Sequence, residues 1–229
     1  MKKEGRDRMG KAYALFDFDG TLISGDSFML LCIYARKKGL NSGVSFWKGI
    51  GAGIRYLLRL CGAKESKEAA LSFLQGKSEK ELQQLSADFC REVLRPRLRV
   101  QGLAELKARR EAGAEVLLIT ASPAFYFEPL KDELGITEII GTRMDMGQDG
   151  RATGRICGEN CKGLQKPLRL AEYLAAVGER LDFSRSYGYG DSASDMPMLE
   201  LCGHKVGVNV RRGLKKRLAK AEGARLVEW

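Results

Sequence analysis

The segment Lys11-Ala-Tyr-Ala-Leu-Phe-Asp-Phe-Asp-Gly-Thr-Leu22 decides how the rest of the chain is interpreted. Its apolar run ends at Phe16 and is followed at once by two carboxylates, Asp17 and Asp19. A short, bounded run of this kind that carries aromatic residues predicts a buried parallel strand rather than a helix. Side chains two residues apart point the same way along a strand. Asp17 and Asp19 should therefore project together from its carboxyl end, where open α/β sheets bind ligands.

These two carboxylates indicate a cation site. Like charges so close to each other repel, and a bound hard cation such as Mg²⁺ commonly relieves the repulsion. Gly20, which follows directly, allows the chain to turn sharply beside a bound group. An Asp-rich surface turn would also explain an isolated Asp-x-Asp-Gly. The choice between a cation site and a surface turn depends on whether further motifs that suit a cation or phosphate site occur downstream.

Length and composition describe a soluble globular protein. The 229 residues can bury one sizeable core and a smaller inserted unit, and 44% hydrophobic with 30% charged residues excludes a disordered chain. No apolar run approaches the ~18 residues of a membrane-spanning helix. The first apolar run is interrupted by Asp17, too early for a signal peptide, so we expect a cytoplasmic protein. Six scattered cysteines suit a reducing compartment.

The net charge of +10 favours anionic partners: phosphorylated substrates, nucleic acid or an anionic membrane surface. Residues 27–64 contain no acidic side chain. The cationic side chains of that range are Arg36, Lys37, Lys38, Lys48, Arg55, Arg59 and Lys64. With His204 as the single histidine, nucleophilic chemistry of the Ser-His-Asp or Cys-His type has little support.

The order of expected elements divides the chain into two units. Residues 26–94 have helical spacing (28–38, 66–74 and 79–94, with 43–60 weakened by three glycines) and contain no convincing strand. Beyond residue 95, strands alternate with helices, which predicts a mostly parallel sheet with helices on both faces. The strands are expected at 114–120, 138–141, 186–190 and 205–210, with a hairpin of 142–146 and 152–157. We therefore predict an α/β core of residues 1–25 and 95–229, interrupted by a helical unit of residues 26–94.

Three further motifs carry chemistry. In Thr120-Ala-Ser122-Pro, a hydroxyl at a strand end precedes amide groups that lead into a helix, which is an anion-binding arrangement. Lys166 falls in the first turn of a helix, where a cation opposes the helix dipole; Lys162 is the competing candidate. Helix capping and solvated lysines are the simpler explanations for these two motifs.

The motif Gly190-Asp-Ser-Ala-Ser-Asp195 follows another expected strand. Its two carboxylates lie at a strand-to-helix turn and can serve one cation. Asp191 would coordinate the cation directly, and Asp195 would support it indirectly through the groups that surround the cation. Capping of a helix start explains either aspartate alone but not both together.

The string Asp17-Phe-Asp-Gly-Thr-Leu22 resembles the first motif of the haloacid dehalogenase superfamily of phosphatases. Thr120, Lys166 and Gly190-Asp-Ser-Ala-Ser-Asp-Met-Pro-Met-Leu199 resemble its second, third and fourth motifs, in the expected order. The resemblance extends over essentially the whole chain. It implies a Rossmann-like, doubly wound parallel core with a small all-helical cap inserted after the first strand, as in the phosphoserine-phosphatase-like branch.

The resemblance also implies residue roles. Asp17 is the nucleophile, Asp19 the general acid and base, and Lys166 neutralises the nucleophile and the phosphate. Mg²⁺ is held by Asp17, Asp191 and the backbone carbonyl of Asp19, with Asp195 behind them. The residues expected to bind phosphate or substrate are Gly20, Asp26, Thr120, Ala121 and Ser122.

One departure bears on the substrate. Phosphoserine phosphatases carry a glutamate that helps hold the substrate ammonium at the position of Asp26, which is one methylene shorter. A basic cap also suits substrates with more negative charge than an amino acid has. We therefore expect an Mg²⁺-dependent phosphomonoesterase that acts on a small or lipid-linked phosphate, with phosphoserine as the alternative substrate.

Two readings from other classes remain. One is a non-enzymatic protein that has the same scaffold and binds anionic surfaces or nucleic acid. The intact motifs and the lack of an aromatic RNA-binding motif argue against this alternative. No nucleic-acid partner is therefore expected. The other is a peripheral contact with anionic membrane through the apolar and basic stretch 46–59. We expect the apolar side chains of this stretch (Trp47, Ile50, Ile54, Leu57) to pack inside the cap instead. The oligomeric state stays open.

Overall fold

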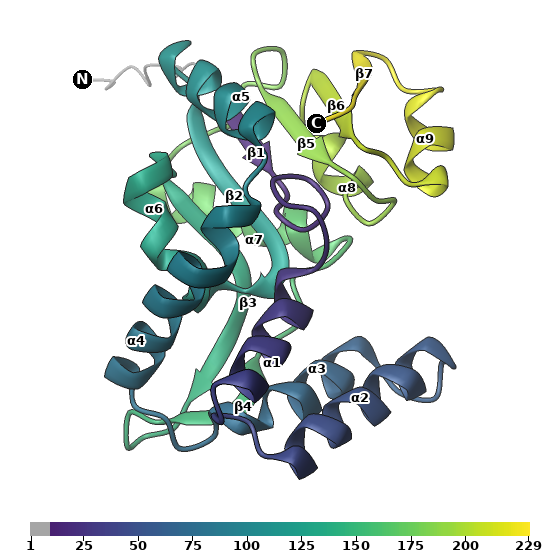
Figure 1. The fold of residues 1–229 in the computed structure, drawn as a ribbon. Helices are drawn as coiled ribbons and strands as arrows, with labels where there is room; N and C mark the ends of the chain where they lie inside the picture. Colours follow the sequence, from purple (N-terminus) through teal and green to yellow (C-terminus); the bar gives the residue numbers. More distant parts are fainter. Residues whose placement is uncertain (1–9) are drawn as a thin grey trace, which may run out of the picture.

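A seven-stranded sheet organises the computed structural model, which describes residues 10–229 (Figure 1). The strands lie in the order β4-β3-β2-β1-β5-β6-β7, and all neighbours are parallel except β3 and β4. Their bounds are β1 Tyr13–Phe16, β2 Glu115–Pro123, β3 Glu138–Met146, β4 Ala152–Cys157, β5 Tyr187–Gly190, β6 His204–Val208 and β7 Ala224–Val227. The expected doubly wound α/β fold is confirmed.

Helices cover both faces of the sheet. Their bounds are α1 Ser27–Lys37, α2 Gly43–Leu57, α3 Ala63–Leu71, α4 Glu79–Phe89, α5 Val100–Glu111, α6 Glu128–Leu134, α7 Gln165–Val177, α8 Met196–Leu199 and α9 Arg212–Leu218. A π-helical stretch, Cys90–Leu94, continues α4.

The central strand β1 is apolar on both faces because it is buried on both. Ala14 and Phe16 belong to one core cluster together with residues of α4, α5 and α6, whereas Tyr13 and Leu15 belong to another with residues of α7, α8 and α9. This alternation follows from the two-residue period of a strand. The same geometry leaves Asp17, the first residue after the strand, at the edge where β1, β2 and β5 end.

Helices α1 to α4 lie between β1 and α5 in the chain and form what is called here the helical segment (residues 27–94). Asp26 caps α1 by accepting a hydrogen bond from the Met29 amide, and Ser78 and Glu81 form a capping box at the start of α4. Figure 1 shows α4 beside α6, while α2 and α3 lie side by side at the lower end of the molecule. Residues 27–94 contain no named strand, as expected.

Several element boundaries differ from expectation. Helix α3 begins after Gly62 rather than at Ser66. Strand β2 continues past Thr120 to Pro123 because its pairing with β3 shifts register between Ile119 and Pro123. Strand β3 runs unbroken through the expected short strand and the first hairpin arm. Strand β7 was not predicted, because Ala-Arg-Leu-Val is too short to show a pattern and is identified only by its pairing with β6.

The expectation that the apolar side chains of α2 pack inside the cap is wrong for three of the four. Trp47, Ile54 and Leu57 are 67%, 53% and 79% exposed. The reason is that α2 packs mainly against α3, and its single buried residue is Ala52. In the described part of the chain, no helix is both long and apolar enough to cross a lipid bilayer.

Candidate active site

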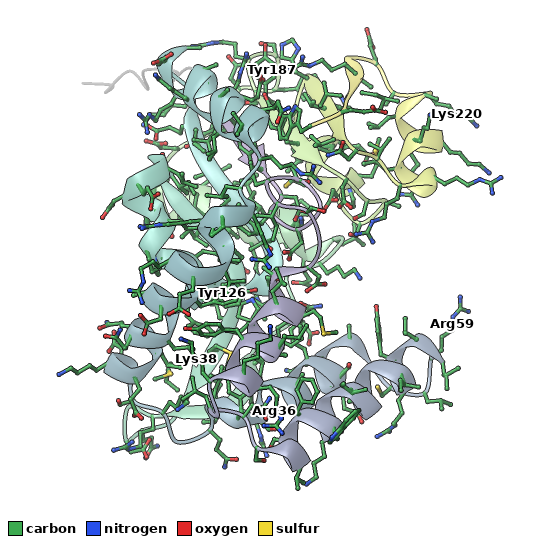
Figure 2. The ribbon with its side chains drawn as sticks, in the orientation of Figure 1. Arg36, Lys38, Arg59, Tyr126, Tyr187 and Lys220 are labelled. Atoms are coloured by element: carbon green, nitrogen blue, oxygen red, sulfur yellow. The ribbon has the colours of Figure 1, made fainter. Side chains whose placement is uncertain are left out.

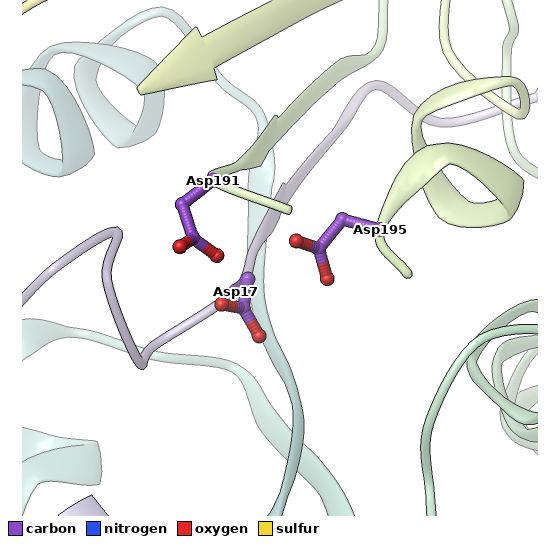
Figure 3. A group of neighbouring side chains, drawn as sticks. All are labelled: Asp17, Asp191 and Asp195. Atoms are coloured by element: carbon purple, nitrogen blue, oxygen red, sulfur yellow. The ribbon is translucent and has the colours of Figure 1, made fainter. Parts of the chain in front are cut away.

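Three carboxylates meet at the carboxyl ends of the central strands (Figure 3). Asp17 follows β1, Asp191 follows β5, and Asp195 precedes α8. One oxygen from each lies within 4.8 Å of the others, and all three residues are buried. The adjacency of β1 and β5 in the sheet brings together residues more than 170 positions apart in the chain.

Lys166 joins two of these carboxylates. Its Nζ donates to Asp17 Oδ1 at 2.6 Å and to Asp195 Oδ1 at 2.7 Å, and the side chain is 1% exposed. The position in the first turn of α7, unfavourable for a cation next to the helix dipole, is explained by these two ion pairs. Lys162 is exposed, with its Nζ 6.0 Å from the centre of the Tyr56 ring. The structure thus places Lys166, not Lys162, on the aspartates.

Both oxygens of Asp195 are engaged inside the protein. Oδ1 accepts from Lys166, and Oδ2 accepts from the amide and the hydroxyl of Ser192. Burial opposes ionisation of this carboxyl, but the Lys166 ammonium and these hydrogen bonds hold its pKa below the ordinary value. Asp195 is therefore suited to orienting Lys166 rather than to meeting a ligand.

Asp17 carries charge that the surrounding side chains do not fully balance. Burial raises its pKa well above the ordinary value; Lys166 opposes this rise, whereas Asp195 and Asp19 add to it. Burial also raises the pKa of Asp191, although Arg211 Nε lies 2.8 Å from Asp191 Oδ2. Buried carboxylate oxygens with excess negative charge match the ligands that Mg²⁺ prefers. The donor set around Asp17 and Asp191 therefore fits a divalent cation.

Gly20 is required by the close approach of Asp191. It has a φ of +81°, and a Cβ at this position would lie 2.4 Å from Asp191 Oδ2. Any larger side chain would push the carboxylate aside, and a non-glycine residue would also strain the backbone. The absence of a side chain at Gly20 therefore leaves the space that the Asp191 carboxylate occupies.

Asp19 belongs to a separate hydrogen-bond network. Its Oδ1 accepts from the amide of Ser27, and its Oδ2 accepts from the hydroxyl of Ser122, both at 2.6 Å. The Ser27 hydroxyl lies 2.9 Å from the hydroxyl of Tyr126, which is fully buried between α1 and α4 (Figure 2). Burial and the charge of Asp26 raise the pKa of Asp19 to about 6, and the bonds from Ser122 and Ser27 limit the rise. Such a carboxyl can give and take a proton near neutral pH.

A cavity of about 280 Å³ opens over these groups and is called here the aspartate cavity. Its walls come from both parts of the chain. The sheet ends supply Asp17, Asp19, Ala121, Ser122, Asp191 and Asp195, and the helical segment supplies Phe28, Tyr56, Ala63, Ser66 and Lys67. A molecule that fills this cavity would therefore lie against both parts of the chain.

Two of the residues expected to bind phosphate or substrate, Thr120 and Asp26, are engaged in other contacts. Thr120 is fully buried and does not line the cavity, and its hydroxyl accepts a hydrogen bond from the Ser122 amide at 3.1 Å. The next two residues, Ala121 and Ser122, do line the cavity. Asp26 lines the cavity, but its carboxylate is also the cap of α1. The phosphate role of Thr120 and the substrate role of Asp26 stay predictions.

The sequence reading missed Lys67 and Asn160. Lys67 Nζ donates to the carbonyl of Ala121 at 2.6 Å and to Asn160 Oδ1 at 2.8 Å, so α3 is tied to the end of β2. Burial lowers the pKa of Lys67 to about 8. No pattern distinguishes Lys67 from the solvated lysines around it, because its partners are distant in sequence.

The basic run of residues 27–64 does not supply the cations of the cavity. Among residues 10–229, those cations are Lys67, Lys162, Lys166 and Arg211. Arg55 pairs with Glu65 and Lys38 with Glu92, and Figure 2 shows Arg59 at the outer tip of the α2–α3 pair. The run is thus largely an outer surface of the helical segment.

Comparison with known proteins agrees with this geometry. The family model of the haloacid dehalogenase-like hydrolases matches residues 14–200. The chain is 32% identical over 225 residues to a histidinol-phosphatase of Neisseria meningitidis serogroup C, covering 93% of this chain and 96% of that protein. A crystal structure of a protein of unknown function from Bordetella pertussis Tohama I superposes with a TM-score of 0.83 at 30% identity, covering 96% and 99% of the two chains.

A substrate-bound phosphoserine phosphatase has the same fold, with a TM-score of 0.63 at 19% identity and 90% of each chain covered. Members of the family typically use Mg²⁺, and its phosphatases act on phosphorylated small molecules. The four motifs, the sheet and these comparisons lead to one conclusion. The chain belongs to the haloacid dehalogenase-like hydrolases and is a phosphatase with the fold of the phosphoserine phosphatases.

Proposed function

We propose that this protein hydrolyses phosphomonoesters with Mg²⁺ through an aspartyl-phosphate intermediate. The observation that carries the proposal is the buried Asp17 carboxylate, held at Oδ1 by Lys166 beside Asp191 at the floor of an open cavity. Residues 26–94 act in this proposal as a cap over a core of residues 1–25 and 95–229.

The reaction has two halves. In the first, an Asp17 oxygen attacks phosphorus in line, the bond to the ester oxygen breaks, and Asp19 gives that oxygen its proton. In the second, Asp19 takes a proton from a water molecule that attacks phosphorus, which releases inorganic phosphate and restores Asp17. The hydrogen bonds that Asp19 accepts from the Ser27 amide and the Ser122 hydroxyl hold its carboxyl beside the cavity.

Lys166 contributes charge throughout. Its ammonium opposes the rise in the pKa of Asp17 that burial causes, and it offsets the negative charge of the phosphoryl group. Asp195 keeps this ammonium in place. Asp17, Asp191 and the backbone carbonyl of Asp19 would hold Mg²⁺, which supplies further positive charge for the phosphoryl oxygens.

Mg²⁺ is expected to stabilise the folded protein, because it binds carboxylates that only the fold brings together. At a concentration 100 times Kd, the gain in free energy of unfolding is ~2.7 kcal/mol. Thermal unfolding of EDTA-treated protein should then shift upward by roughly 5–10 °C on addition of Mg²⁺. Asp191→Asn should lose most of this shift, whereas Asp132→Asn, an exposed carboxylate of α6, should keep it. An undiminished shift in Asp191→Asn would contradict the proposed ligand.

Asp19→Asn tests the proton transfer. An amide can occupy the same place between Ser27 and Ser122 but cannot donate the proton that the leaving oxygen needs. Turnover of alkyl phosphates should fall by ~10²-fold or more. Turnover of p-nitrophenyl phosphate, whose leaving group needs less protonation, should fall less. Equal losses for the two substrates would remove Asp19 from the acid role.

The substrate is proposed to be a small or lipid-linked phosphate other than phosphoserine. Among residues 10–229, Asp26 is the single acidic residue of the cavity outside the Asp17–Asp19–Asp191–Asp195 group, and its carboxylate is engaged as the cap of α1. A screen of purified protein with Mg²⁺ against phosphoserine, histidinol phosphate, alkyl phosphates and lipid phosphates tests this proposal. If phosphoserine gives the highest kcat/KM, the specificity argument is wrong.

A further inference from the structure

A second cavity, of about 450 Å³, lies between α1, α2 and α3 at the surface of the helical segment and is called here the apolar cavity. Met29, Ile54 and Leu57, which line it, are 52%, 53% and 79% exposed. Apart from Asp26, Asn41 and Ser66, its lining is apolar or glycine. The apolar side chains that line it are Phe28, Met29, Cys32, Phe46, Ile50, Ile54, Tyr56, Leu57 and Ala70. Its size is in the range of sites that hold small organic ligands.

The apolar cavity adjoins the aspartate cavity. Asp26, Phe28, Tyr56 and Ser66 line both cavities. A molecule with its phosphate at Asp17 therefore has an apolar compartment next to the rest of its structure.

Two glycines of α2 show how the cavity is kept open. Gly49 faces α3 closely, since a Cβ there would lie 3.0 Å from the Cα of Ala70. Gly53, one turn further on the same side of α2, lines the cavity, and a Cβ there would meet no atom within 4 Å. The helices are thus in contact at one glycine and leave space at the next.

One residue that lines the apolar cavity carries a buried polar atom without a partner. Asn41 lines the apolar cavity and is 1% exposed, and within the described residues its Oδ1 has no hydrogen-bond partner. A buried carbonyl oxygen without a partner is costly, so such atoms in native proteins commonly meet water or a ligand.

From these observations we infer that the apolar cavity is the binding site for the organic part of the substrate, and that the substrate is a phosphomonoester with a largely apolar chain. This inference rests on the proposed function, because it places the phosphate at Asp17. The substrate class differs from phosphoserine, whose organic part is charged at two positions and would lose hydration in an apolar compartment.

The test uses n-alkyl phosphates from ethyl to octyl, each below its micelle-forming concentration, with Mg²⁺. Because each buried methylene contributes a factor of about three to four, kcat/KM should rise by that factor per methylene until the chain fills the cavity. Gly53→Leu should fill the space and lower kcat/KM for octyl phosphate by roughly tenfold or more, with little change for ethyl phosphate. Gly51→Leu is the matched control, since it replaces an exposed glycine of the same helix that faces open space outside the cavity.

Calorimetric titration with n-alkyl phosphonates, which are not hydrolysed, separates this inference from the proposed function. Affinity should increase with chain length and heat capacity should fall on binding, and Gly53→Leu but not Gly51→Leu should remove both effects. Binding that is independent of chain length, or equal in the two variants, would overturn the inference whether or not the protein is a phosphomonoesterase. Chain-dependent binding without hydrolysis of any phosphate would instead overturn the proposed function and leave the apolar site in place.

Discussion

Asp17→Asn is expected to lower kcat/KM for every phosphomonoester substrate by at least ~10³-fold, the scale of losing a covalent nucleophile. An amide is a poor nucleophile and a poor ligand for Mg²⁺. It also cannot form the ion pair that joins Asp17 Oδ1 to Lys166 Nζ. The fold should persist, because the amide is nearly the same size as the carboxylate and removes one of three clustered negative charges.

The measurement is steady-state hydrolysis with Mg²⁺ together with thermal unfolding. Asp132→Asn makes the same chemical change at the exposed surface of α6 and should leave both quantities as they are in the wild type. If Asp17→Asn retains even a tenth of wild-type turnover, Asp17 is not the nucleophile. If Asp17→Asn is inactive but does not unfold cooperatively, the loss of activity reflects the loss of the fold and does not test the nucleophile. Asp17→Glu, which keeps the negative charge but places it one methylene further from the backbone, is then the deciding variant.

Lys166→Met should lower both activity and stability. Removing the ammonium leaves Asp17 and Asp195 buried without their shared partner, and breaking a buried ion pair from one side costs ~3–5 kcal/mol in free energy of unfolding. Loss of charge stabilisation at the phosphoryl group should lower kcat by ~10²–10³-fold.

The stability loss of Lys166→Met should depend on pH in a definite direction. Without the ammonium, the pKa of Asp17 in the folded state rises further above its value in the unfolded chain, and the pKa of Asp195, which Lys166 holds below its ordinary value, rises as well. A carboxyl with a raised pKa in the folded state loses stability as pH rises through that value. Measured without metal, the difference in free energy of unfolding from wild type should therefore be larger at pH 8 than at pH 5.

Lys162→Met provides the control, because Lys162 is exposed and bonds neither aspartate. It should change the free energy of unfolding by no more than ~0.5 kcal/mol, with no dependence on pH between 5 and 8. The opposite result, with Lys162→Met inactive and Lys166→Met close to wild type, would assign the neutralising role to Lys162.

The sequence alone was sufficient to predict the α/β fold, because a parallel strand buried on both faces is a continuous apolar run. That Asp17 and Asp191 share one site was implied by the family resemblance of the motifs that contain them. The helical character of residues 27–94 and the capping box of Ser78 and Glu81 are likewise local properties, so they could be predicted without knowledge of partners.

Roles that depend on partners distant in the chain were decided by the tertiary structure. The choice of Lys166 over Lys162 is an example: both stand near the start of α7, but only one reaches the aspartates. Lys67 is another, because burial against Ala121 and Asn160, not its neighbours in sequence, distinguishes it from a solvated lysine.

The helical segment shows the same division most clearly. Apolar residues at helical spacing predict α2, but the periodicity does not indicate which element packs against each face of the helix. Trp47 and Leu57 remain exposed because α2 packs mainly against α3. Strand β7 is too short to show a pattern and exists through its hydrogen bonds to β6. The apolar cavity, too, arises from the spacing of three helices. Sequence patterns thus determine which elements form and where strand ends converge, whereas cavities, exposed faces and ion-pair partners depend on distances between elements, which only the packed chain sets.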